Sequence, residues 1–502
     1  MYLRQNLIDL GSPSEFWEYF EQISRIPRCS GEEEQIRDFI IREAKNLNFN
    51  AKIDKVGNLV IKIPSKSDKE NVKSVVLQCH MDMVCEKNKE IQHDFSKDPL
   101  KLKIVEISGE NWLTAEGTTL GADNGVGISY LLTLMKKINK GELVYNSLNL
   151  EFLFTVDEEV GLVGAFNIDK DLIKGKYLIN LDSEEDDNFT IGCAGGMKTI
   201  GEIKIKYNKI EKERNPIPMK LSIKGLLGGH SGVDIHRGRA NAIKLMAIIL
   251  WKLHKDNYFA LNSIHGGNRA NAIPRECFAI LFLLPDDYYP IMELFNKIKD
   301  ETISRFSDIE PNLEIKLQKL ENFDNRKIFP DNLLKNLLHI LYIMPNGPIS
   351  MHLKIPDLVY TSTNLGSINI ENDFLKIVTS QRSLEEISKV IICERIHALM
   401  TFADRNIIIE HEGNYPGWEP DFNSELLEIC SETFKELFDK DPKVRAIHAG
   451  LECGILKEHF PEMEVISIGP TVEGAHSPDE RLRIRSVEKF WNFLIKLLDS
   501  IN

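Results

Sequence analysis

Short apolar runs alternate with amphipathic stretches over roughly the first 200 residues of the chain. The stretches between the runs place apolar residues at helical spacing, as Phe16, Phe20 and Ile23 do. The apolar runs have the length of buried strands and span about 58–63, 74–79, 147–156 and 177–182. This alternation is typical of a mostly parallel sheet covered by helices, so we expect an α/β fold in this part of the chain.

The pattern changes after the glycine pair Gly195-Gly196, where strand-like segments and helices follow a different order. In the middle of the chain the expected strands are 202–207, 219–225, 276–284, 366–379 and 405–411, and the expected helices are 237–254 and 384–402. A helix at about 423–438 and a strand at 465–468 follow. We therefore expect a discontinuous α/β domain formed by residues 1–195 and 415–502, interrupted by an inserted α+β domain at 196–414.

Length and charge narrow the class of protein. A chain of 502 residues is too long for one core and predicts two or three domains. The 62 basic and 76 acidic residues give a net charge of −14, which argues against a nucleic-acid partner. The sequence begins without an apolar signal segment and has no run of eighteen apolar residues, so we expect a cytoplasmic protein with no membrane partner. The eight cysteines show no disulfide-like pattern.

Potential metal ligands follow three of the expected strands. His80 follows the run 74–79, Glu158 and Glu159 follow 147–156, and Asp182 ends 177–182. In open α/β sheets the ligand crevice lies beyond the carboxyl ends of the strands, so these side chains should meet. Imidazole and carboxylate are the ligands of Zn²⁺ when one position must stay open for water. The sequence therefore predicts a metal-dependent hydrolase.

A hydrolytic centre with two metal ions needs a carboxylate that bridges them and further ligands on each ion. Asp123 is the expected bridge, because each of its oxygens can take one ion. His80 and Asp182 would complete one ion, and Glu159 and His476 would complete the other.

Two carboxylates remain beside these ligands. Successive side chains of an extended segment point in opposite directions, so only one of Glu158 and Glu159 can bind a metal. We expect Glu158 to act as general base on a water that bridges the metals. Asp82 lies two residues after His80 and is expected to hydrogen-bond its imidazole.

Each of these residues also has an ordinary structural explanation. A lone histidine at a strand end is more often packed than metal-bound, and Asp123 could simply cap the helix that follows it. An acidic pair such as Glu158-Glu159 is usually solvated, and we expect the acidic run 184–187 to be solvated as well. The metal-site hypothesis depends on the five ligands forming a complete set.

The motifs around these residues resemble those of the co-catalytic zinc exopeptidases, the family that includes aminoacylase and peptidase T. The matching segments are LQCHMDMV at 77–84, GADNGVG at 121–127, TVDEEVG at 155–161, NLDSE at 180–184, GLLGGHSG at 225–232, HAGLECG at 448–454 and GAHSP at 474–478. The similarity covers essentially the whole chain. Within the family, the chain most resembles the aminoacyl-histidine dipeptidases.

The resemblance implies a role for each matching residue. The ligand positions fall on the five residues already named, the general base on Glu158, and the orienting aspartate on Asp82. The resemblance also implies a cis peptide bond between Asp123 and Asn124. By the same resemblance, residues 1–195 and 415–502 form the catalytic domain and the inserted domain at 196–414 is a lid domain. In the lid domain, it implies that His230 contacts the oxyanion and that Arg382 binds the substrate carboxylate. The other substrate contacts that it implies are Asn271 and the backbone of Gly450.

The resemblance also implies an activity. We expect a dinuclear zinc dipeptidase, in which Co²⁺ or Mn²⁺ could replace zinc, acting on unblocked dipeptides of the Xaa-His type such as β-Ala-His. The lid domain would form a homodimer interface. Two alternatives stay open: a sister tripeptidase or N-acyl amino acid amidohydrolase, and a non-catalytic relative that uses the fold for binding or dimerisation.

Overall fold

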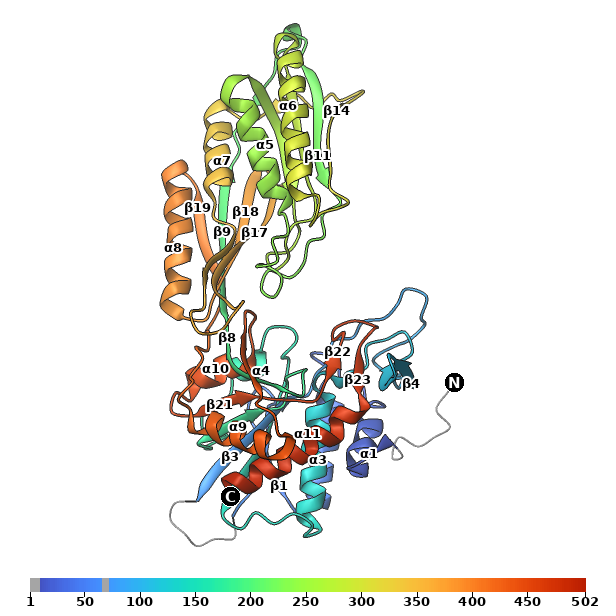
Figure 1. Cartoon of the computed structure of the whole chain (residues 1–502). Helices are drawn as coiled ribbons and strands as arrows, with labels where there is room; N and C mark the ends of the chain where they lie inside the picture. The colour runs from blue at the N-terminus through green and yellow to red at the C-terminus, as the bar shows by residue number, and fades with distance from the viewer. Residues whose placement is uncertain (1–9, 66–71) are drawn as a thin grey trace. The chain divides into compact units, whose positions relative to one another are not determined.

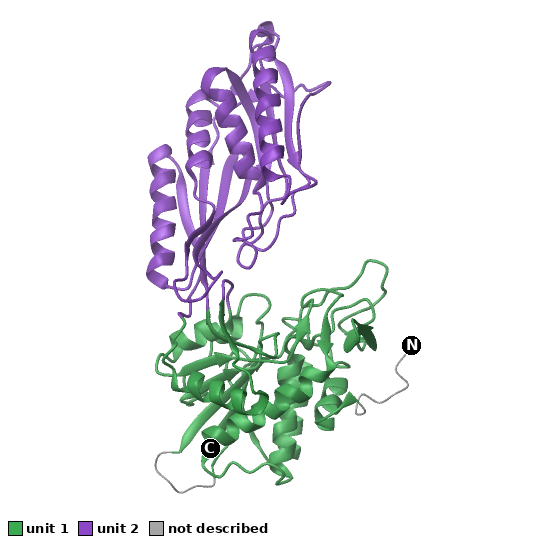
Figure 2. Cartoon of the chain, in the orientation of Figure 1, with its two compact units in different colours: residues 1–192, 420–446, 451–502 green, residues 193–419, 447–450 purple. Residues whose placement is uncertain are grey.

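The computed structural model describes residues 10–65 and 72–502, which form two compact units (Figure 2). Unit 1 contains Met1–Gly192, Pro420–Ala446 and Leu451–Asn502, and unit 2 contains Cys193–Glu419 and Ile447–Gly450. The N-terminal segment without a signal pattern, residues 1–9, lies outside the described residues. No helix within the described ranges combines the length and apolar character that a membrane span requires.

Unit 1 is built on an eight-stranded sheet with the order β1-β2-β6-β3-β7-β21-β8-β20. The strands are β1 Asn50–Ile53, β2 Leu59–Ile63, β3 Lys73–His80, β6 Leu148–Thr155, β7 Tyr177–Asn180, β8 Asn188–Cys193, β20 Lys443–Ile447 and β21 Glu464–Ser467. The four central strands β6, β3, β7 and β21 are parallel, whereas β1, β2 and β8 pair antiparallel with their neighbours. The predicted α/β fold with a mostly parallel sheet is confirmed for this central part, and the antiparallel strands lie outside it.

Helices lie beside the sheet of unit 1 (Figure 1), and their apolar residues are buried. The helices of unit 1 are α1 Ser14–Ile23, α2 Glu34–Asn46, α3 Ala122–Asn139, α4 Val163–Phe166, α9 Glu425–Phe438, α10 Glu452–His459 and α11 Ile484–Ile501. The predicted apolar stripe of α1 is buried, and the ring of Phe16 lies 4.5 Å from that of Tyr130 on α3. Burial of each such aromatic side chain contributes about 1.5–3 kcal/mol to folding. The Tyr130 hydroxyl donates to the Val487 carbonyl at 3.0 Å and ties α3 to α11.

A small second sheet, with the order β22-β23-β5-β4, holds the C-terminal loop that carries His476. Its strands are β4 Leu102–Ile107, β5 Glu110–Ala115, β22 Val472–Glu473 and β23 Arg481–Arg483. Leu482 is fully buried opposite Leu113, whereas Arg481 and Arg483 are partly exposed. This alternation is typical of a strand with one buried face, and the chain turns into α11 at Ile484.

Unit 2 contains a nine-stranded antiparallel sheet with the order β14-β11-β13-β12-β17-β18-β9-β19, in which β16 also pairs with β17. Its strands are β9 Gly195–Lys204, β11 Ile217–Lys224, β12 Phe259–Gly266, β13 Cys277–Leu283, β14 Glu314–Lys319, β16 Gly347–Met351, β17 Val359–Glu371, β18 Phe374–Ser383 and β19 Ile408–Tyr415. Its longer helices are α5 Ala242–Asp256, α6 Pro285–Phe306, α7 Asp331–Ile343 and α8 Glu386–Ala403. The short strands β10 Asn208–Lys209 and β15 Lys327–Ile328 form a separate pair, and Lys212–Arg214 is a 3₁₀ turn. The helices and the sheet share one apolar core.

Two elements of unit 2 differ from the prediction. The helix expected at 237–254 begins at Ala242, because the Asn241 side chain accepts from the amides of Ile243 and Lys244 and caps it there. The strand expected at 366–379 is a hairpin of β17 and β18. It turns at Asn372 and Asp373, which both adopt the left-handed conformation that these residue types tolerate.

The cysteines are a further difference. Cys29 and Cys85 form a disulfide across 56 residues of sequence, so the expectation of no disulfide is wrong for this pair. Neither cysteine belongs to a short-spaced motif, so only the fold brings them together. Cys79, which precedes His80, is a buried free thiol.

Candidate metal centre

The first group of potential ligands is His80, Asp123 and Asp182. His80 ends β3 and Asp182 follows β7. These adjacent parallel strands finish at the same edge of the sheet. Asp123 comes from the first turn of α3. The Nε2 atom of His80 lies 2.9 Å from Asp123 Oδ1 and 3.4 Å from Asp182 Oδ1.

The second group is Asp123, Glu159 and His476. The Nε2 atom of His476 lies 3.1 Å from Asp123 Oδ2 and 3.1 Å from Glu159 Oε2. Asp123 therefore faces one histidine with each of its oxygens and belongs to both groups. The peptide bond that follows it, Asp123-Asn124, is cis, as the family resemblance implied.

The charges of these side chains fit divalent cations. Burial alone would raise the pKa of Asp123, but His476 and His80 hold it well below its usual range. Hydrogen bonds to Asp123 and Glu159 raise the pKa of His476 to about 11. The Oε1 atom of Glu159 is buried without a hydrogen-bond partner. A set of three carboxylates and two imidazoles that share one aspartate is a donor set suited to two divalent ions.

Asp82 links His80 to the segment that carries the two glutamates. Its Oδ1 lies 3.3 Å from His80 Nδ1. Its carboxylate also accepts from the amides of Glu158 and Glu159, at 3.0 and 3.2 Å, and from the Ser30 hydroxyl at 2.7 Å. Burial alone would raise the pKa of Asp82, but these donors lower it to about 2. Asp82 is thus an ionised acceptor that orients the imidazole and the 158–159 backbone together.

Glu158 lies beside the first group without belonging to it. One of its carboxylate oxygens is within 4.8 Å of donor atoms of His80 and Glu159. Burial raises the pKa of Glu158 well above its ordinary value, and the nearby carboxylates of Asp182 and Glu452 add to that effect. Bound cations would oppose this shift and favour the ionised carboxylate that a general base requires.

Two buried residues that the sequence analysis did not single out hold the loop of Asp123. The Glu480 carboxylate accepts from four consecutive amides, those of residues 120–123, at 2.7, 2.9, 2.7 and 3.2 Å. On the other side, Arg28 donates to the carbonyls of Met81 and Asp82 at 3.1 and 2.9 Å, and also to that of Gly121. These contacts fix the backbone on both sides of the cluster. The only sequence signal for Glu480 is its position four residues after His476.

A third missed residue, Glu452, lies in a motif that carried the family resemblance. It is almost fully buried and accepts from Gln78 Nε2 at 2.6 Å and from Thr155 Oγ1 at 2.8 Å. Burial raises its pKa to about 7. Glu452 thereby joins β3 to β6 just before the two strands deliver their candidate site residues.

The substrate-binding residues expected in the lid domain gather within unit 2. Arg382 Nη2 lies 3.5 Å from His230 Nε2, and Arg382 Nη1 donates to the Tyr415 hydroxyl at 2.6 Å. The Asn271 carbonyl accepts from the amide of Ser231 at 2.8 Å, although the Asn271 side chain is exposed. Gly450 lies against the Tyr415 ring. Tyr415 was not predicted as a site residue.

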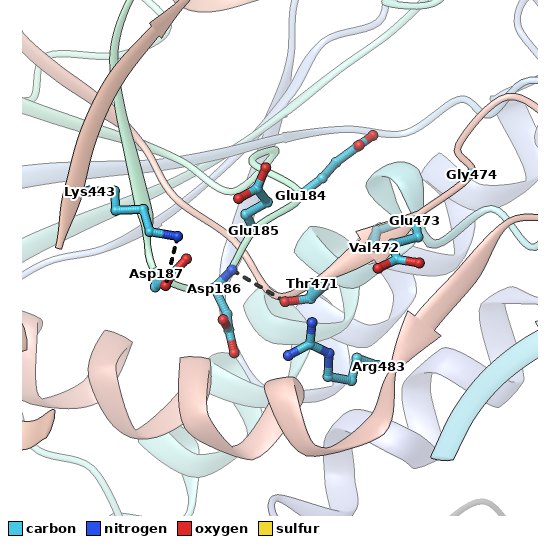
Figure 3. A pocket seen from close by; sticks show the side chains of 10 residues that line it. All are labelled: Glu184, Glu185, Asp186, Asp187, Lys443, Thr471, Val472, Glu473, Gly474 and Arg483. Carbon is cyan, nitrogen blue, oxygen red and sulfur yellow. Dashed lines mark hydrogen bonds and ion pairs between the residues drawn. The ribbon is translucent and has the colours of Figure 1, made fainter. Parts of the chain in front are cut away.

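Unit 1 also has a polar pocket of about 560 Å³ that none of the five candidate ligands lines (Figure 3). It contains the acidic run Glu184–Asp187, of which Glu184 and Glu185 are exposed as predicted. The other two are partly buried and paired: Asp186 with Lys489 at 3.2 Å, and Asp187 with Lys440 at 2.7 Å. Ion pairing therefore compensates much of the charge of this run.

Two histidine–carboxylate groups that share an aspartate, at the carboxyl edge of a parallel sheet, define a metal-dependent hydrolase. Residues 76–500 match the model of peptidase family M20/M25/M40, and the chain belongs to this family. The resemblance drawn from the motifs is therefore confirmed.

Full-length relatives support the assignment. The chain is 37% identical to the cytosol non-specific dipeptidase of Escherichia coli over 495 residues. This alignment covers 98% of each of the two chains. The crystal structure of aminoacylhistidine dipeptidase from Vibrio alginolyticus matches with a TM-score of 0.87 at 35% identity, over 99% of both chains. An aminopeptidase of Bacillus cereus, with a TM-score of 0.57 and 14% identity over 99% of both chains, shares the fold.

Proposed function

We propose that this protein is a dipeptidase that uses two zinc ions, which Co²⁺ or Mn²⁺ could replace, and that it acts in the cytoplasm. Its substrates would be unblocked dipeptides, including those with a C-terminal histidine. The observation that carries the proposal is Asp123, whose two oxygens each face a histidine of a different ligand group. The dipeptidases from Escherichia coli and Vibrio alginolyticus support the substrate class by similarity over nearly the whole chain.

The ligands divide between two ions. His80 and Asp182 would hold one cation and Glu159 and His476 the other, with Asp123 between them. When bound, the cations would polarise the scissile carbonyl and lower the pKa of water.

The side chains around the ions would move the protons. The Glu158 carboxylate takes a proton from the attacking water and then delivers it to the leaving amine. Asp82 accepts from His80 Nδ1, which leaves the Nε2 lone pair directed toward the ligand group.

His230 would stabilise the oxyanion as a neutral hydrogen-bond donor. Its Nδ1 accepts from the amides of Gly232 and Val233, both at 3.3 Å, so its proton is on Nε2. Burial, together with the charge of Arg382, lowers the pKa of His230 to about 4 and keeps the ring neutral near pH 7. Arg382 would bind the substrate carboxylate, with Asn271 and the Gly450 backbone as further contacts.

We further propose a homodimer formed through unit 2. The outward face of α8 exposes four large apolar side chains: Ile387, Val390, Ile391 and Phe402. The neighbouring β19 is an edge strand of the sheet, and it exposes Ile408. A second copy that pairs at this edge would cover both the apolar face and the unpaired strand.

A substrate panel tests the proposed activity. The protein is loaded with zinc and assayed on β-Ala-His, a tripeptide and an N-acetyl amino acid. We expect kcat/KM to be highest for the dipeptide. Faster cleavage of the tripeptide or of the N-acetyl amino acid would assign the site to a sister activity, and no hydrolysis of any of them would leave a non-catalytic protein.

A further inference from the structure

Arg382 is a buried cation for which the described residues supply no anionic partner. Its side chain, on β18, belongs to a residue that is only 7% exposed. The polar contacts of its guanidinium among the described residues are with Tyr415 and His230 and include no carboxylate, and its Nε has no hydrogen-bond partner. Its nearest polar neighbours, His230 and Tyr415, are uncharged near neutral pH. A buried guanidinium in such surroundings is stabilised when an anionic ligand binds it.

Two hydrogen-bond donors, His230 Nε2 and Arg382 Nη2, also face each other. His230 carries its proton on Nε2, because its Nδ1 accepts from two backbone amides. That Nε2 lies 3.5 Å from Arg382 Nη2, which can only donate. Two donors directed toward each other favour an acceptor that bonds to both.

The position of Tyr415 is set by contacts other than the one with Arg382. Its ring lies in a slot between Gly196 and Gly450, where an added Cβ would approach the ring to 2.5 and 2.9 Å. Its carbonyl accepts at 2.6 Å from Nζ of Lys389, a residue with no exposed surface. The Tyr415 hydroxyl is therefore a fixed point to which the guanidinium is bonded.

We propose that Tyr415 is a positioning residue that makes this site selective for peptides with a free α-carboxylate. This inference rests on the proposed dipeptidase function and deepens it. Because the Tyr415 hydroxyl accepts from Nη1, the donors of Arg382 that lack an acceptor lie on the edge formed by Nε and Nη2. That edge donates two parallel hydrogen bonds and matches the two oxygens of a carboxylate, which a C-terminal amide cannot reproduce.

Tyr415→Phe tests the inference, because it removes one oxygen and leaves the ring in its slot. The variant and the wild type, both zinc-loaded, are assayed on β-Ala-His and on the same dipeptide with a C-terminal amide. We expect KM for the acid to rise about tenfold, with kcat little changed, and the acid-to-amide ratio of kcat/KM to fall by the same factor. Arg382→Lys should lower this ratio too, because an ammonium cannot bind a carboxylate bidentately.

The control is Tyr360→Phe, which removes a hydroxyl of unit 2 whose hydrogen-bond partner is the Glu419 carboxylate, at 3.5 Å. It should leave the ratio unchanged. Equal losses on the acid and the amide in Tyr415→Phe, or no loss on either, would overturn the positioning role while leaving the dipeptidase function intact. If the wild type cleaves neither peptide, the proposed function fails and this inference fails with it.

Discussion

The carboxylate of Asp123 faces His80 with one oxygen and His476 with the other, although 353 residues separate Asp123 from His476. Its own backbone is fixed by a second buried carboxylate, that of Glu480. One acidic side chain is thus placed to bind metal and another to hold the loop that presents it. Two predictions at the scale of single residues separate these roles.

Glu158→Gln removes the proposed base and keeps the shape of the side chain. We expect the variant to retain its metal, because Glu158 lies outside both ligand groups that contain Asp123. We expect kcat on β-Ala-His to fall by a factor of about 10²–10⁴. Metal content and kcat are measured on the same preparation, with the exposed Glu185→Gln as the control. A variant that kept most of its activity would remove Glu158 from the mechanism.

Glu480→Gln leaves only one oxygen to accept from the four amides and places an NH₂ group against the others. The loop of Asp123 should lose its fixed position, so we expect zinc affinity to fall about 10–100-fold. Competition with a chromophoric chelator measures this affinity. Glu473→Gln, which removes a carboxylate paired with Arg481 on the neighbouring strand, is the matched control. Equal zinc affinity in Glu480→Gln and the wild type would show that the amide contacts do not support the ligand.

The convergence of the candidate ligands could be predicted from the sequence, because residues at the carboxyl ends of neighbouring parallel strands meet at one edge of the sheet. His80, Glu159 and Asp182 each follow an apolar run, and parallel strands deliver such positions to one edge. Glu480, Arg28 and Tyr415 carry no such signal. They act through backbone groups or through another side chain, across long sequence separations, so only the folded chain shows their partners.

At the scale of elements, apolar periodicity located most helices and strands but not all of their ends. The start of α5 depends on a hydrogen-bonding cap at Asn241, and the turn between β17 and β18 depends on two residues with positive φ. Both features depend on polar residues, whose hydrogen bonds and backbone conformations apolar periodicity does not describe. The antiparallel outer strands of the unit 1 sheet are equally invisible to periodicity, which does not encode strand direction.

Two histidines of unit 2, the buried His448 and the half-buried His230, predict how the stability of this unit depends on pH. Burial, with the charge of Arg382, lowers the pKa of His448 to about 3 and that of His230 to about 4. Below about pH 6.5 the unfolded chain binds protons that these folded rings exclude. The free energy of unfolding should therefore fall as the pH drops from about 6.5 toward 3, on the order of 4 kcal/mol for His448.

Urea denaturation of the metal-free protein between pH 7 and pH 4 checks this dependence. His448→Gln, which removes the group with the larger shift, should show a shallower loss than the wild type. The exposed His265→Gln is the control and should follow the wild type. If the free energy of unfolding fell equally with pH in His448→Gln and in the wild type, His448 would not be a source of the pH dependence.

At the scale of the whole molecule, the family resemblance identified from motifs extends over nearly the entire chain, and the full-length relatives agree with it. The oligomeric state is the property about which the sequence motifs say least. The apolar face of α8 makes it testable, because a surface of this kind is costly to leave in water.

We expect the wild-type chain to sediment as a dimer and the double variant Ile387→Glu/Phe402→Glu to sediment as a monomer. The two positions lie on the same face of α8, and Phe402 is 91% exposed. Leu353→Glu is the control, because this side chain is fully exposed and lies outside α8. A wild-type monomer, or a double variant that stays dimeric, would exclude this face as the interface.

Zinc stoichiometry tests the central claim, a two-ion centre shared through Asp123, most directly. Equilibrium dialysis of the purified chain, followed by elemental analysis, should find two ions per wild-type chain and a loss of both affinities in Asp123→Ala, since each ion would lose a ligand. A wild-type chain that binds one ion or none, or an Asp123→Ala variant that keeps two with unchanged affinity, would contradict the account.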